Sequence, residues 1–460
     1  MDTPIYDFVR DYARSGVRRL HVPGHKGVPS PLGCEALDIT EVQGADVLHA
    51  ASGIIARSEE NAAALFGSGK TFYSTEGSSH CIRAMVWLAL LARGAGTPPV
   101  IAAARNVHSA FVSAAALCGA EPLWLWPERR DSLCRCEITP QVLDRALARA
   151  GGGVAAVYIT SPDYLGNLAD IPGLSAVCRK YGRPLLVDNA HGAYLKFLPR
   201  SLHPLDLGAD MCCDSAHKTL PVLTGGAWLH IAPGAPPAFS ENARRALALF
   251  GSTSPSYLTL CSLDLCCAAL AGDYPARLAD TVGALEALRG TLAGQGWTVD
   301  GSDPARLTLR GDGPEIAARL RRGGVEPEYV DPDFAVLMAT PDNSPGDLAQ
   351  LAAALGECTL PPRALPRLPL GRCERVCSPR QALFAPQETV PVAAAPGRVC
   401  GAPAVSCPPA VPIAISGERI GPEALALLEY YGVPDLCVLR SDCGPDAGGL
   451  WMADPGEASY

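Results

Sequence analysis

Residues 184–192, with the sequence PLLVDNAHG, decide the fold class. The first four are apolar and form a run short enough for a buried strand, and a carboxylate, Asp188, follows directly. Similar apolar runs at residues 100–103, 154–159 and 226–231 alternate with helical patterns. This alternation predicts an α/β fold with a mainly parallel sheet covered by helices. Because such sheets bind ligands at the carboxyl ends of their strands, Asp188 is a candidate ligand-binding residue.

Length and composition limit the possible classes of protein. The chain has 460 residues, of which 48% are hydrophobic and 18% charged, so it can bury a large core. Its formal net charge is −9 and it has no basic runs, so we expect no nucleic-acid partner. It also lacks an apolar stretch of the roughly 20 residues that a bilayer requires, and a signal-peptide pattern, so we expect a cytoplasmic protein without a membrane partner. The 18 cysteines are spread over a large chain, which favours buried reduced thiols.

Changes of pattern along the chain predict four parts. Residues 1–50 form a short helix and a loop, and residues 51–272 form the large domain. Residues 273–360 have the pattern of a smaller α+β domain. A Pro-rich stretch then leads to a C-terminal domain, residues 361–460.

Two further motifs complement Asp188. Residues 75–79 (TEGSS) precede an amphipathic helical pattern at 81–91, and the N–H groups of a helix N-terminus favour a phosphate. Residues 215–219 (SAHKT) contain Lys218. Each motif alone has an ordinary explanation, as a helix cap or a surface pair. Together they match pyridoxal 5′-phosphate (PLP), which needs a lysine for a Schiff base, a carboxylate that keeps the pyridine nitrogen protonated and a cradle for the phosphate.

With these motifs the chain resembles the ornithine/lysine/arginine decarboxylase family of fold-type-I PLP enzymes, in particular its shorter, Gram-positive-type members. The resemblance implies an aspartate aminotransferase-like large domain with a mainly parallel sheet, a smaller α+β domain and a C-terminal decarboxylase-type domain. It rests on motifs spread over nearly the whole chain: residues 21–27 (HVPGHKG), 38–46 (DITEVQGAD), 105–108 (RNVH), 159–166 (ITSPDYLG), 188–192 (DNAHG), 215–226 (SAHKTLPVLTGG), 252–257 (STSPSY) and 408–419 (PPAVPIAISGER).

The resemblance implies a role for each matching residue. Lys218 would bind PLP covalently, Asp188 would partner its pyridine nitrogen and His108 would stack on its ring, and these three are the expected catalytic residues. Thr253 lies in a segment that resembles the part of the family that reaches the phosphate of a neighbouring subunit. We therefore expect a homodimer, or a larger homo-oligomer, with shared active sites. The other expected cofactor-binding residues are Gly77, Ser78, Ser79, Ala190, His191, Ser215 and His217.

The implied activity is decarboxylation of a basic L-amino acid (arginine, lysine or ornithine) to the amine and CO2, as in polyamine metabolism. Either His108 or Lys218 would return a proton to the substrate Cα. A cationic substrate side chain needs an acidic partner, for which Glu418, Glu41 and Asp46 are candidates, although each could instead cap a helix or face solvent. Two other functions stay open: a different fold-type-I PLP enzyme such as an aminotransferase, and a PLP-binding regulator without turnover.

Four positions depart from the family pattern. Ser109 stands where the family commonly has Lys, and Asn189 stands where an acidic residue is common. Cys407 replaces a Tyr, and Ala410 replaces a Gly. The last two lie in the domain that helps to shape the substrate entrance, so the departures leave the identity of the substrate open.

We expect no metal site. Residues 67–71 (GSGKT) end like a phosphate-binding P-loop, but a helical pattern precedes them instead of a strand. Cysteine pairs such as Cys134 and Cys136 lack the Cys-x-x-Cys spacing of structural zinc sites. His21 and His25 are separated by Pro and Gly, which prevent the helix that would align them.

Overall fold

The computed structural model describes residues 1–93, 99–361, 363–369, 371–403 and 409–441. Its chain falls into two compact units. Unit 1 comprises Met1–Ala92, Pro184–Gly283 and Ala339–Asp342, and unit 2 comprises Arg93–Arg183, Ala284–Met338 and Asn343–Tyr460. Because each unit collects several separate segments, the four-part division of the sequence stays a prediction.

Unit 1 contains β1 (Lys70–Ser74), β5 (Leu185–Asp188), β6 (Met211–Asp214) and β7 (Ala227–Ile231). These strands lie in the order β1-β7-β6-β5. β5 and β6 are parallel, with Asp188 opposite Cys213. β7 is antiparallel to both of its neighbours, β6 and β1. The parallel pair brings the carboxyl ends of β5 and β6, and the residues that follow them, to one edge.

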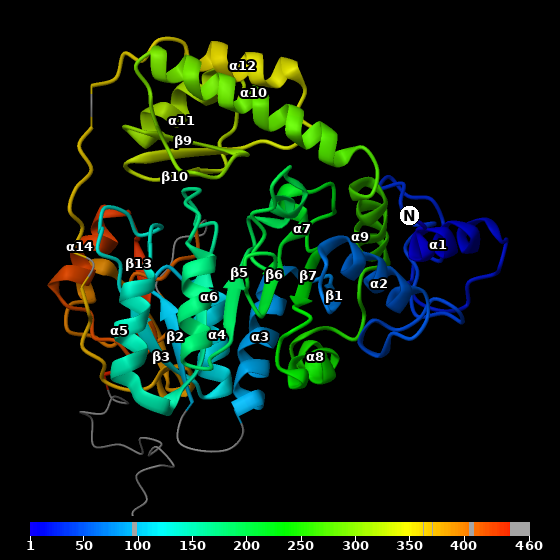
Figure 1. Ribbon diagram of the computed structural model, residues 1–460, viewed down its shortest axis with the longest axis horizontal. Helices are drawn as coiled ribbons and strands as arrows, with labels where there is room; N and C mark the ends of the chain where they lie inside the picture. Colours follow the sequence, from blue (N-terminus) through cyan, green and yellow to red (C-terminus); the bar gives the residue numbers. More distant parts are fainter. Residues whose placement is uncertain (94–98, 362, 370, 404–408, 442–460) are drawn as a thin grey trace, which may run out of the picture. The chain divides into compact units, whose positions relative to one another are not determined.

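The helices of unit 1 cover its strands and carry parts of the predicted motifs. α1, α2 and α9 pack against one another, and α2 also packs against β1 (Figure 1). α10 (Tyr274–Gly294) begins in unit 1 and ends in unit 2. The helices of unit 1 are α1 (Pro4–Arg14), α2 (Ile54–Phe66), α3 (Gly77–Arg93), α7 (Ala216–Thr219), α8 (Pro237–Phe250) and α9 (Tyr257–Leu270), with short 3-10 turns at Leu48–Ala50 and Ala193–Phe197.

Unit 2 contains three parallel strands. β2 (Val100–Ala104) lies between β3 (Glu121–Leu125) and β4 (Val154–Thr160) and runs parallel to both. β3 is the last strand in the order, which explains how it can contain Pro122, since proline is confined to edge strands. The accompanying helices are α4 (Ser109–Cys118), α5 (Pro140–Ala150) and α6 (Ile171–Lys180), with a 3-10 turn at Gly151–Gly153.

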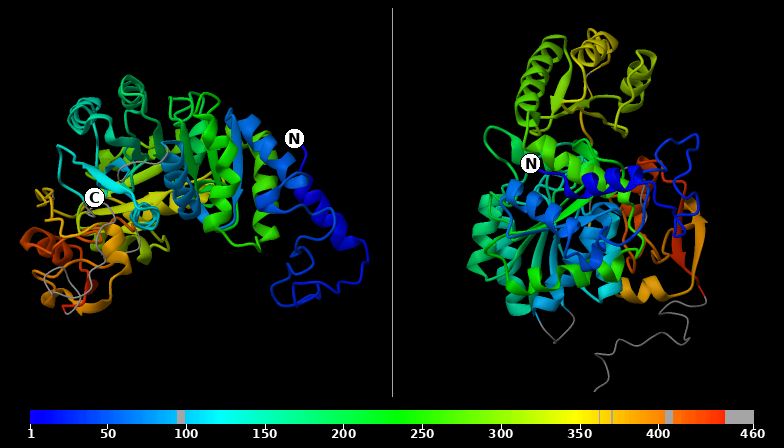
Figure 2. Two further views of the ribbon diagram at one scale, coloured as in Figure 1. Left: turned by 90° about the horizontal axis from the view of Figure 1, so that it is seen from below. Right: turned by 90° about the vertical axis from the view of Figure 1, so that its right-hand side faces the viewer.

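Two smaller sheets complete unit 2. The first is antiparallel, in the order β10-β11-β9-β8, and consists of β8 (Thr298–Asp300), β9 (Arg306–Arg310), β10 (Tyr329–Val330) and β11 (Phe334–Met338). α11 (Gly313–Arg322) packs on this sheet and α12 (Pro345–Leu355) packs against α11, so the helices lie on one side of it (Figures 1 and 2). The second pairs β12 (Gln387–Pro391) with β13 (Asp435–Leu439), near α13 (Pro379–Phe384), the turn Val392–Ala394 and α14 (Pro422–Tyr430).

The fold is α/β with a mostly parallel central sheet, which confirms the predicted class. The four apolar runs correspond to β2, β4, β5 and β7. β1, β3 and β6 were not predicted, because they contain Lys, Thr, Glu, Pro or adjacent Cys residues instead of an uninterrupted branched apolar run.

The described residues also bear on the cysteines and on membranes. The 16 cysteines in this part of the chain are all free, and 11 of them are buried, in agreement with the predicted reduced thiols. Within the same residues, no helix is both long and apolar enough to cross a bilayer.

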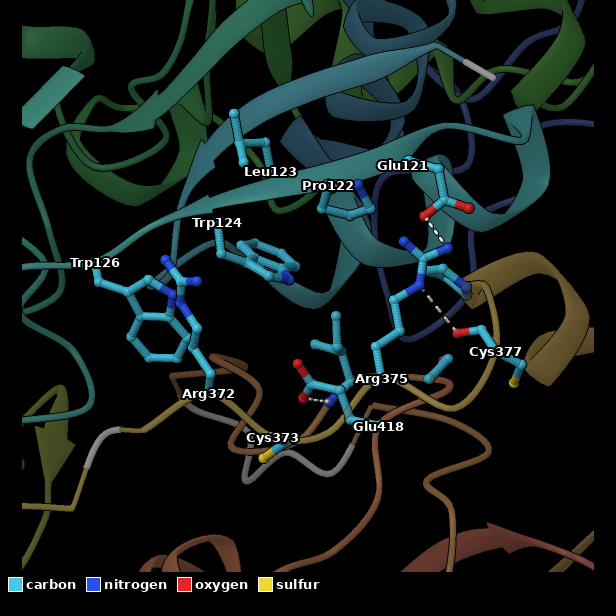
Figure 3. A pocket seen from close by; sticks show the side chains of 13 residues that line it. Glu121, Pro122, Leu123, Trp124, Trp126, Arg372, Cys373, Arg375, Cys377 and Glu418 are labelled. Atoms are coloured by element: carbon cyan, nitrogen blue, oxygen red, sulfur yellow. Dashed lines mark hydrogen bonds and ion pairs between the residues drawn. The ribbon is translucent and has the colours of Figure 1, made fainter. Parts of the chain in front are cut away.

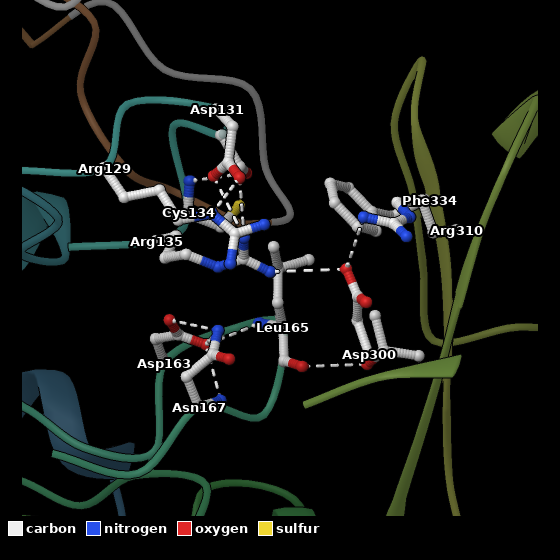
Figure 4. Close-up of polar contacts among 12 residues, drawn as sticks. Arg129, Asp131, Cys134, Arg135, Asp163, Leu165, Asn167, Asp300, Arg310 and Phe334 are labelled. Atoms are coloured by element: carbon white, nitrogen blue, oxygen red, sulfur yellow. Dashed lines mark hydrogen bonds and ion pairs between the residues drawn. The ribbon is translucent and has the colours of Figure 1, made fainter. Parts of the chain in front are cut away.

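A buried arginine connects a loop of unit 2 to its small antiparallel sheet. The Arg135 side chain is 4% exposed, and its Nη1 donates to both carboxylate oxygens of Asp131, at 3.0 and 2.8 Å. Its Nη2 lies 3.5 Å from Oδ2 of Asp300, at the end of β8, and its guanidinium carbon lies 5.9 Å from the centre of the Phe334 ring (Figure 4). One cation therefore holds two carboxylates from different segments.

We expect Arg135→Ala to destabilise unit 2 by about 1.5–3 kcal/mol, because the substitution removes charge-assisted hydrogen bonds to Asp131, which keeps Arg129 as a second partner. Urea denaturation followed by tryptophan fluorescence measures the change. Arg321→Ala is the matched control, since Arg321 pairs with Glu326 at the surface, where an ion pair contributes little. Equal shifts of the two denaturation midpoints would contradict the importance of the buried pair.

Candidate active site

Asp188 is the last residue of β5, and its side chain is fixed by neighbouring groups. The residue is 2% exposed. Its Oδ1 accepts a hydrogen bond from the backbone N–H of Ala190 at 3.1 Å and a weaker one from Sγ of Cys213 at 3.7 Å. The carboxylate is thus held at the carboxyl end of the strand, where the sequence predicted a ligand-binding residue.

The two motifs with Asp188 and Lys218 meet in unit 1. Ser215 immediately follows β6 and precedes α7, which carries Lys218 in its single turn. The Lys218 ammonium nitrogen Nζ lies 3.0 Å from Nε2 of His191, and His191 is 6% exposed. The amine and the imidazole are therefore within hydrogen-bonding distance.

The Gly-Ser-Ser turn joins the same group of residues. Gly77 begins α3 with a φ of +73°, in the left-handed region that favours glycine, and its N–H donates to the carbonyl of Gly225 at 2.7 Å. Ser215 Oγ donates to Ser78 Oγ at 2.7 Å. Nδ1 of His217 lies 3.0 Å from the carbonyl oxygen of Gly226, and burial lowers the pKa of His217. Hydroxyls from two motifs therefore converge at a helix N-terminus, next to Ser79.

The segment with Thr253 is attached to the same turn. The backbone N–H of Ser252 donates to Oε1 of Glu76 at 2.6 Å, and the Ser252 carbonyl lies 3.1 Å from Nε2 of His49. Thr253 itself is exposed. Its contact with a neighbouring subunit stays a prediction.

Two of the candidate substrate carboxylates lie in unit 1 and differ in what they already bind. Asp46 accepts hydrogen bonds from five backbone N–H groups around the start of α2. Partial burial would raise the pKa of Asp46, but hydrogen bonds from Ser52 and Gly53 outweigh it and lower the pKa. Glu41 accepts from the hydroxyl of Thr40 through Oε2, whereas its buried Oε1 has no hydrogen-bond partner among the described residues. Glu41 therefore has one buried oxygen whose hydrogen-bonding capacity the described residues leave unused.

Beside Asp188 lies a buried polar pair that no sequence motif indicates. Asn189 Nδ2 donates to Oδ1 of Asp214 at 2.6 Å, and Oδ2 of Asp214 lies 3.0 Å from Nε2 of His203 and 3.4 Å from Nε2 of His230. Burial alone would raise the pKa of Asp214, but the two histidines hold it below its ordinary value. An acidic residue at position 189, which is common in the family, would place a second carboxylate against Asp214. The amide of Asn189 avoids this repulsion and donates a hydrogen bond instead.

His108 belongs to unit 2, where it forms the N-cap of α4. Its Nδ1 accepts from the backbone N–H of Ala110 at 3.0 Å, which fixes the orientation of the ring. The neighbouring Ser109 N–H donates to the carbonyl of Ala410 at 2.9 Å. Arg105 strengthens this connection, since its Nη1 and Nη2 donate to the carbonyls of Pro412 and Ile413 at 2.6 and 2.9 Å. The loop that carries His108 is thus bound to the C-terminal segment, a contact that no sequence motif indicates.

Glu418 lines a cavity of about 170 Å³ in unit 2, together with Trp124, Trp126 and Arg375 (Figure 3). Its Oε2 accepts from the backbone N–H of Ile415 at 3.0 Å and lies 3.7 Å from Nη2 of Arg105. Burial raises the pKa of Glu418, although Arg105 opposes this effect. These contacts account for the carboxylate without a substrate, so its role in substrate binding stays a prediction. Cys407 and Pro408, from the same C-terminal motif, lie outside the described residues.

The residues of unit 1 fit PLP in their chemistry. A buried carboxylate ends β5, an amine lies one turn beyond β6, and hydroxyl groups converge at the start of α3 beside a glycine in the left-handed conformation. These are the groups that a basic ring nitrogen, an aldehyde and a phosphate require. Together with the mostly parallel sheet, they define a fold-type-I PLP enzyme.

Comparison with known proteins supports this class. The family model described as "Orn/Lys/Arg decarboxylase, major domain" matches residues 3–310, and the chain belongs to this family. An arginine decarboxylase of Bacillus subtilis is 30% identical over 93% of this chain and 93% of its own length. An arginine decarboxylase of Halalkalibacterium halodurans is 29% identical over 93% and 92%. The lysine decarboxylase of Francisella novicida shares the fold, with a TM-score of 0.79 at 16% identity over 95% of this chain and 81% of that chain. The chain is therefore a PLP-dependent decarboxylase, as the resemblance implied.

We expect Ala410→Gly to stabilise the protein by about 1 kcal/mol. Ala410 has a φ of +56°, a conformation that costs an alanine about 1–2 kcal/mol and a glycine almost nothing. Thermal unfolding measures the change. Ala287→Gly, at an exposed position within α10, is the control and is expected to destabilise by about 1 kcal/mol. A lower unfolding temperature for Ala410→Gly would show that this backbone conformation is not maintained.

Proposed function

We propose that this protein decarboxylates a basic L-amino acid, with arginine preferred over lysine and ornithine, and that the amine product enters polyamine metabolism. The main support is the arginine decarboxylase of Bacillus subtilis, which is similar over nearly the whole of both chains. The arrangement of Asp188, Lys218 and the Gly-Ser-Ser turn supports the chemistry.

In this proposal the cofactor supplies an electron sink for the pair of electrons released when the Cα–carboxylate bond breaks. Lys218 would hold the cofactor covalently, with Nε2 of His191 3.0 Å from its Nζ to orient the amine. Asp188, whose Oδ1 accepts from the N–H of Ala190, would face the ring nitrogen. His108 would stack on the ring.

The phosphate of the cofactor is held, in this proposal, at the start of α3. Ser78 and Ser215 are 2.7 Å apart, so both hydroxyls can reach one phosphate group. Gly77 and Ser79 contribute at the same helix N-terminus, where N–H groups favour an anion. His217 and, from a second copy of the chain, Thr253 complete the site, which requires a homodimer or a larger homo-oligomer. We place this enzyme in the cytoplasm.

For the substrate side chain, the contacts favour Glu41 among the three candidates. Asp46 is saturated by backbone N–H groups and Glu418 is bound by Arg105 and Ile415. Glu41 retains a buried oxygen without a hydrogen-bond partner in the described part of the chain. Binding a cation there would satisfy that oxygen.

Reduction with borohydride tests the assignment of Lys218. The purified protein is expected to be yellow, and reduction should fix the cofactor to the peptide that contains Lys218. Lys218→Ala should abolish this labelling and lower kcat by several orders of magnitude, because the covalent attachment is lost. Lys180→Ala, at an exposed lysine, is the control and should label normally. Labelling of any other peptide in the unsubstituted protein would contradict the assignment.

A substrate panel tests the activity. Arginine, lysine and ornithine are each supplied with PLP, and CO2 and the amine are quantified, with arginine expected to give the highest kcat/KM. Glu41→Gln should raise KM for arginine about tenfold, the effect of losing one hydrogen bond to a charged group. A keto acid without CO2 would indicate an aminotransferase, and a coloured protein that turns over none of the three would indicate a PLP-binding regulator.

A further inference from the structure

Unit 1 contains a fully buried group of two histidines and an aspartate outside the set of residues assigned to the cofactor. Asp214 ends β6, His230 lies on the adjacent strand β7, and His203 lies in the loop before β6. The three side chains are each 0% exposed. One ligand atom from each lies within 4.8 Å of the others. Imidazole and carboxylate are both common ligands of zinc.

The spacing of these atoms is that of ligands around one ion. Asp214 Oδ2 lies 3.0 Å from Nε2 of His203 and 3.4 Å from Nε2 of His230. Two atoms bound at about 2.0–2.1 Å in a tetrahedral site are separated by roughly 3.4 Å. The first distance is also that of an ordinary hydrogen bond, whereas the second is longer than most such bonds.

An unsatisfied nitrogen supports a ligand at this position. Nε2 of the buried His230 has no hydrogen-bond partner within the described residues. Its other nitrogen, Nδ1, is hydrogen-bonded to Oγ1 of Thr71 at 2.8 Å, which orients the ring with Nε2 toward Asp214. The remaining oxygen of Asp214 accepts from Asn189. Such outer contacts are typical of metal ligands, because they fix the direction of the ligating atom.

A fourth donor lies on the same face of the sheet, but its sulfur is not within 4.8 Å of all three ligand atoms, so its side chain would have to turn to reach the ion. Cys212 lies directly opposite His230 in the register of β6 and β7, and its Sγ is 4.0 Å from Nε2 of His203. Zinc binds thiolate and imidazole in closed four-ligand structural sites. One carboxylate and one thiolate would neutralise the double charge of the ion, which a buried site requires.

We propose that His203, Asp214, His230 and Cys212 bind a structural Zn²⁺ ion. Binding forms one bond from each of these side chains to the ion. The proton of the Cys212 thiol and the Nε2 proton that His203 donates to Asp214 pass to solvent, with no change of oxidation state. The ion connects β6 and β7 directly and reaches β5 through Asn189, which follows Asp188. It therefore stabilises the strand ends that carry the candidate active site, without contact with substrate.

Metal analysis of the full-length protein, with its cofactor, tests this proposal. After growth in zinc-supplemented medium and dialysis against metal-free buffer, we expect about one zinc per chain by mass spectrometry. X-ray absorption at the zinc edge should show one sulfur at about 2.3 Å and nitrogen and oxygen ligands at about 2.0–2.1 Å. This measurement needs no substitution, so it does not depend on whether a variant folds.

Three variants identify the ligands. Asp214→Asn and His230→Gln should each lower the zinc content at least tenfold, since each removes or weakens one of four ligands. Cys212→Ser should remove the sulfur signal. His25→Gln is the matched control. His25 and Asp38 also form a His–Asp pair, with 3.1 Å between Nε2 and Oδ2, but both side chains are partly exposed and lie in a loop segment. This control should keep its zinc.

The proposal is overturned if the unsubstituted protein contains less than about a tenth of an equivalent of zinc and takes up none when Zn²⁺ is added. It is also overturned if Asp214→Asn and the control retain equal zinc, since the ion would then be bound elsewhere, for example to the cofactor. An absorption spectrum without sulfur would remove Cys212 from the ligand set.

Discussion

The parallel pairing of β5 with β6 is the constraint on which the candidate active site depends. Because Asp188 lies opposite Cys213, both strands end at the same edge of the sheet. The next residues of each strand therefore start from neighbouring positions, and short turns are enough to bring Lys218 to His191. A shift of this register would separate that contact, since side chains alternate between the two faces of a strand. The contact of Ser215 with Ser78 depends instead on the pairing of β6 and β1 with β7.

Burial imposes the second constraint, because each polar group beside the strand ends must find a partner. Asp214 illustrates this requirement. Its oxygens are met by the amide of Asn189 and by His203, which makes a buried carboxylate tolerable. The same reasoning explains why an amide can replace the acidic residue common in the family, since two facing carboxylates in a closed environment would repel each other.

The sequence was sufficient for the features that are local. Apolar runs predicted the strand that ends at Asp188, and the motifs predicted residues that meet in unit 1. It was insufficient where stability comes from distant partners. β6, with its adjacent cysteines, is a strand because it pairs with two neighbours, and its own residues have no strong strand preference. The bonds from Arg105 to the carbonyls of Pro412 and Ile413 join segments about 300 residues apart, which no spacing rule connects.

The three candidate substrate carboxylates show why residue type alone cannot assign a binding role. All three matched the chemical requirement equally, since each supplies a negative charge. They differ in the bonds that a substrate would have to displace: Asp46 would give up backbone N–H groups that cap α2, and Glu418 would give up Arg105 and the N–H of Ile415. Glu41 would give up no hydrogen bond at Oε1 to any of the described residues. Available hydrogen-bonding capacity therefore favours Glu41 over residues of the same charge.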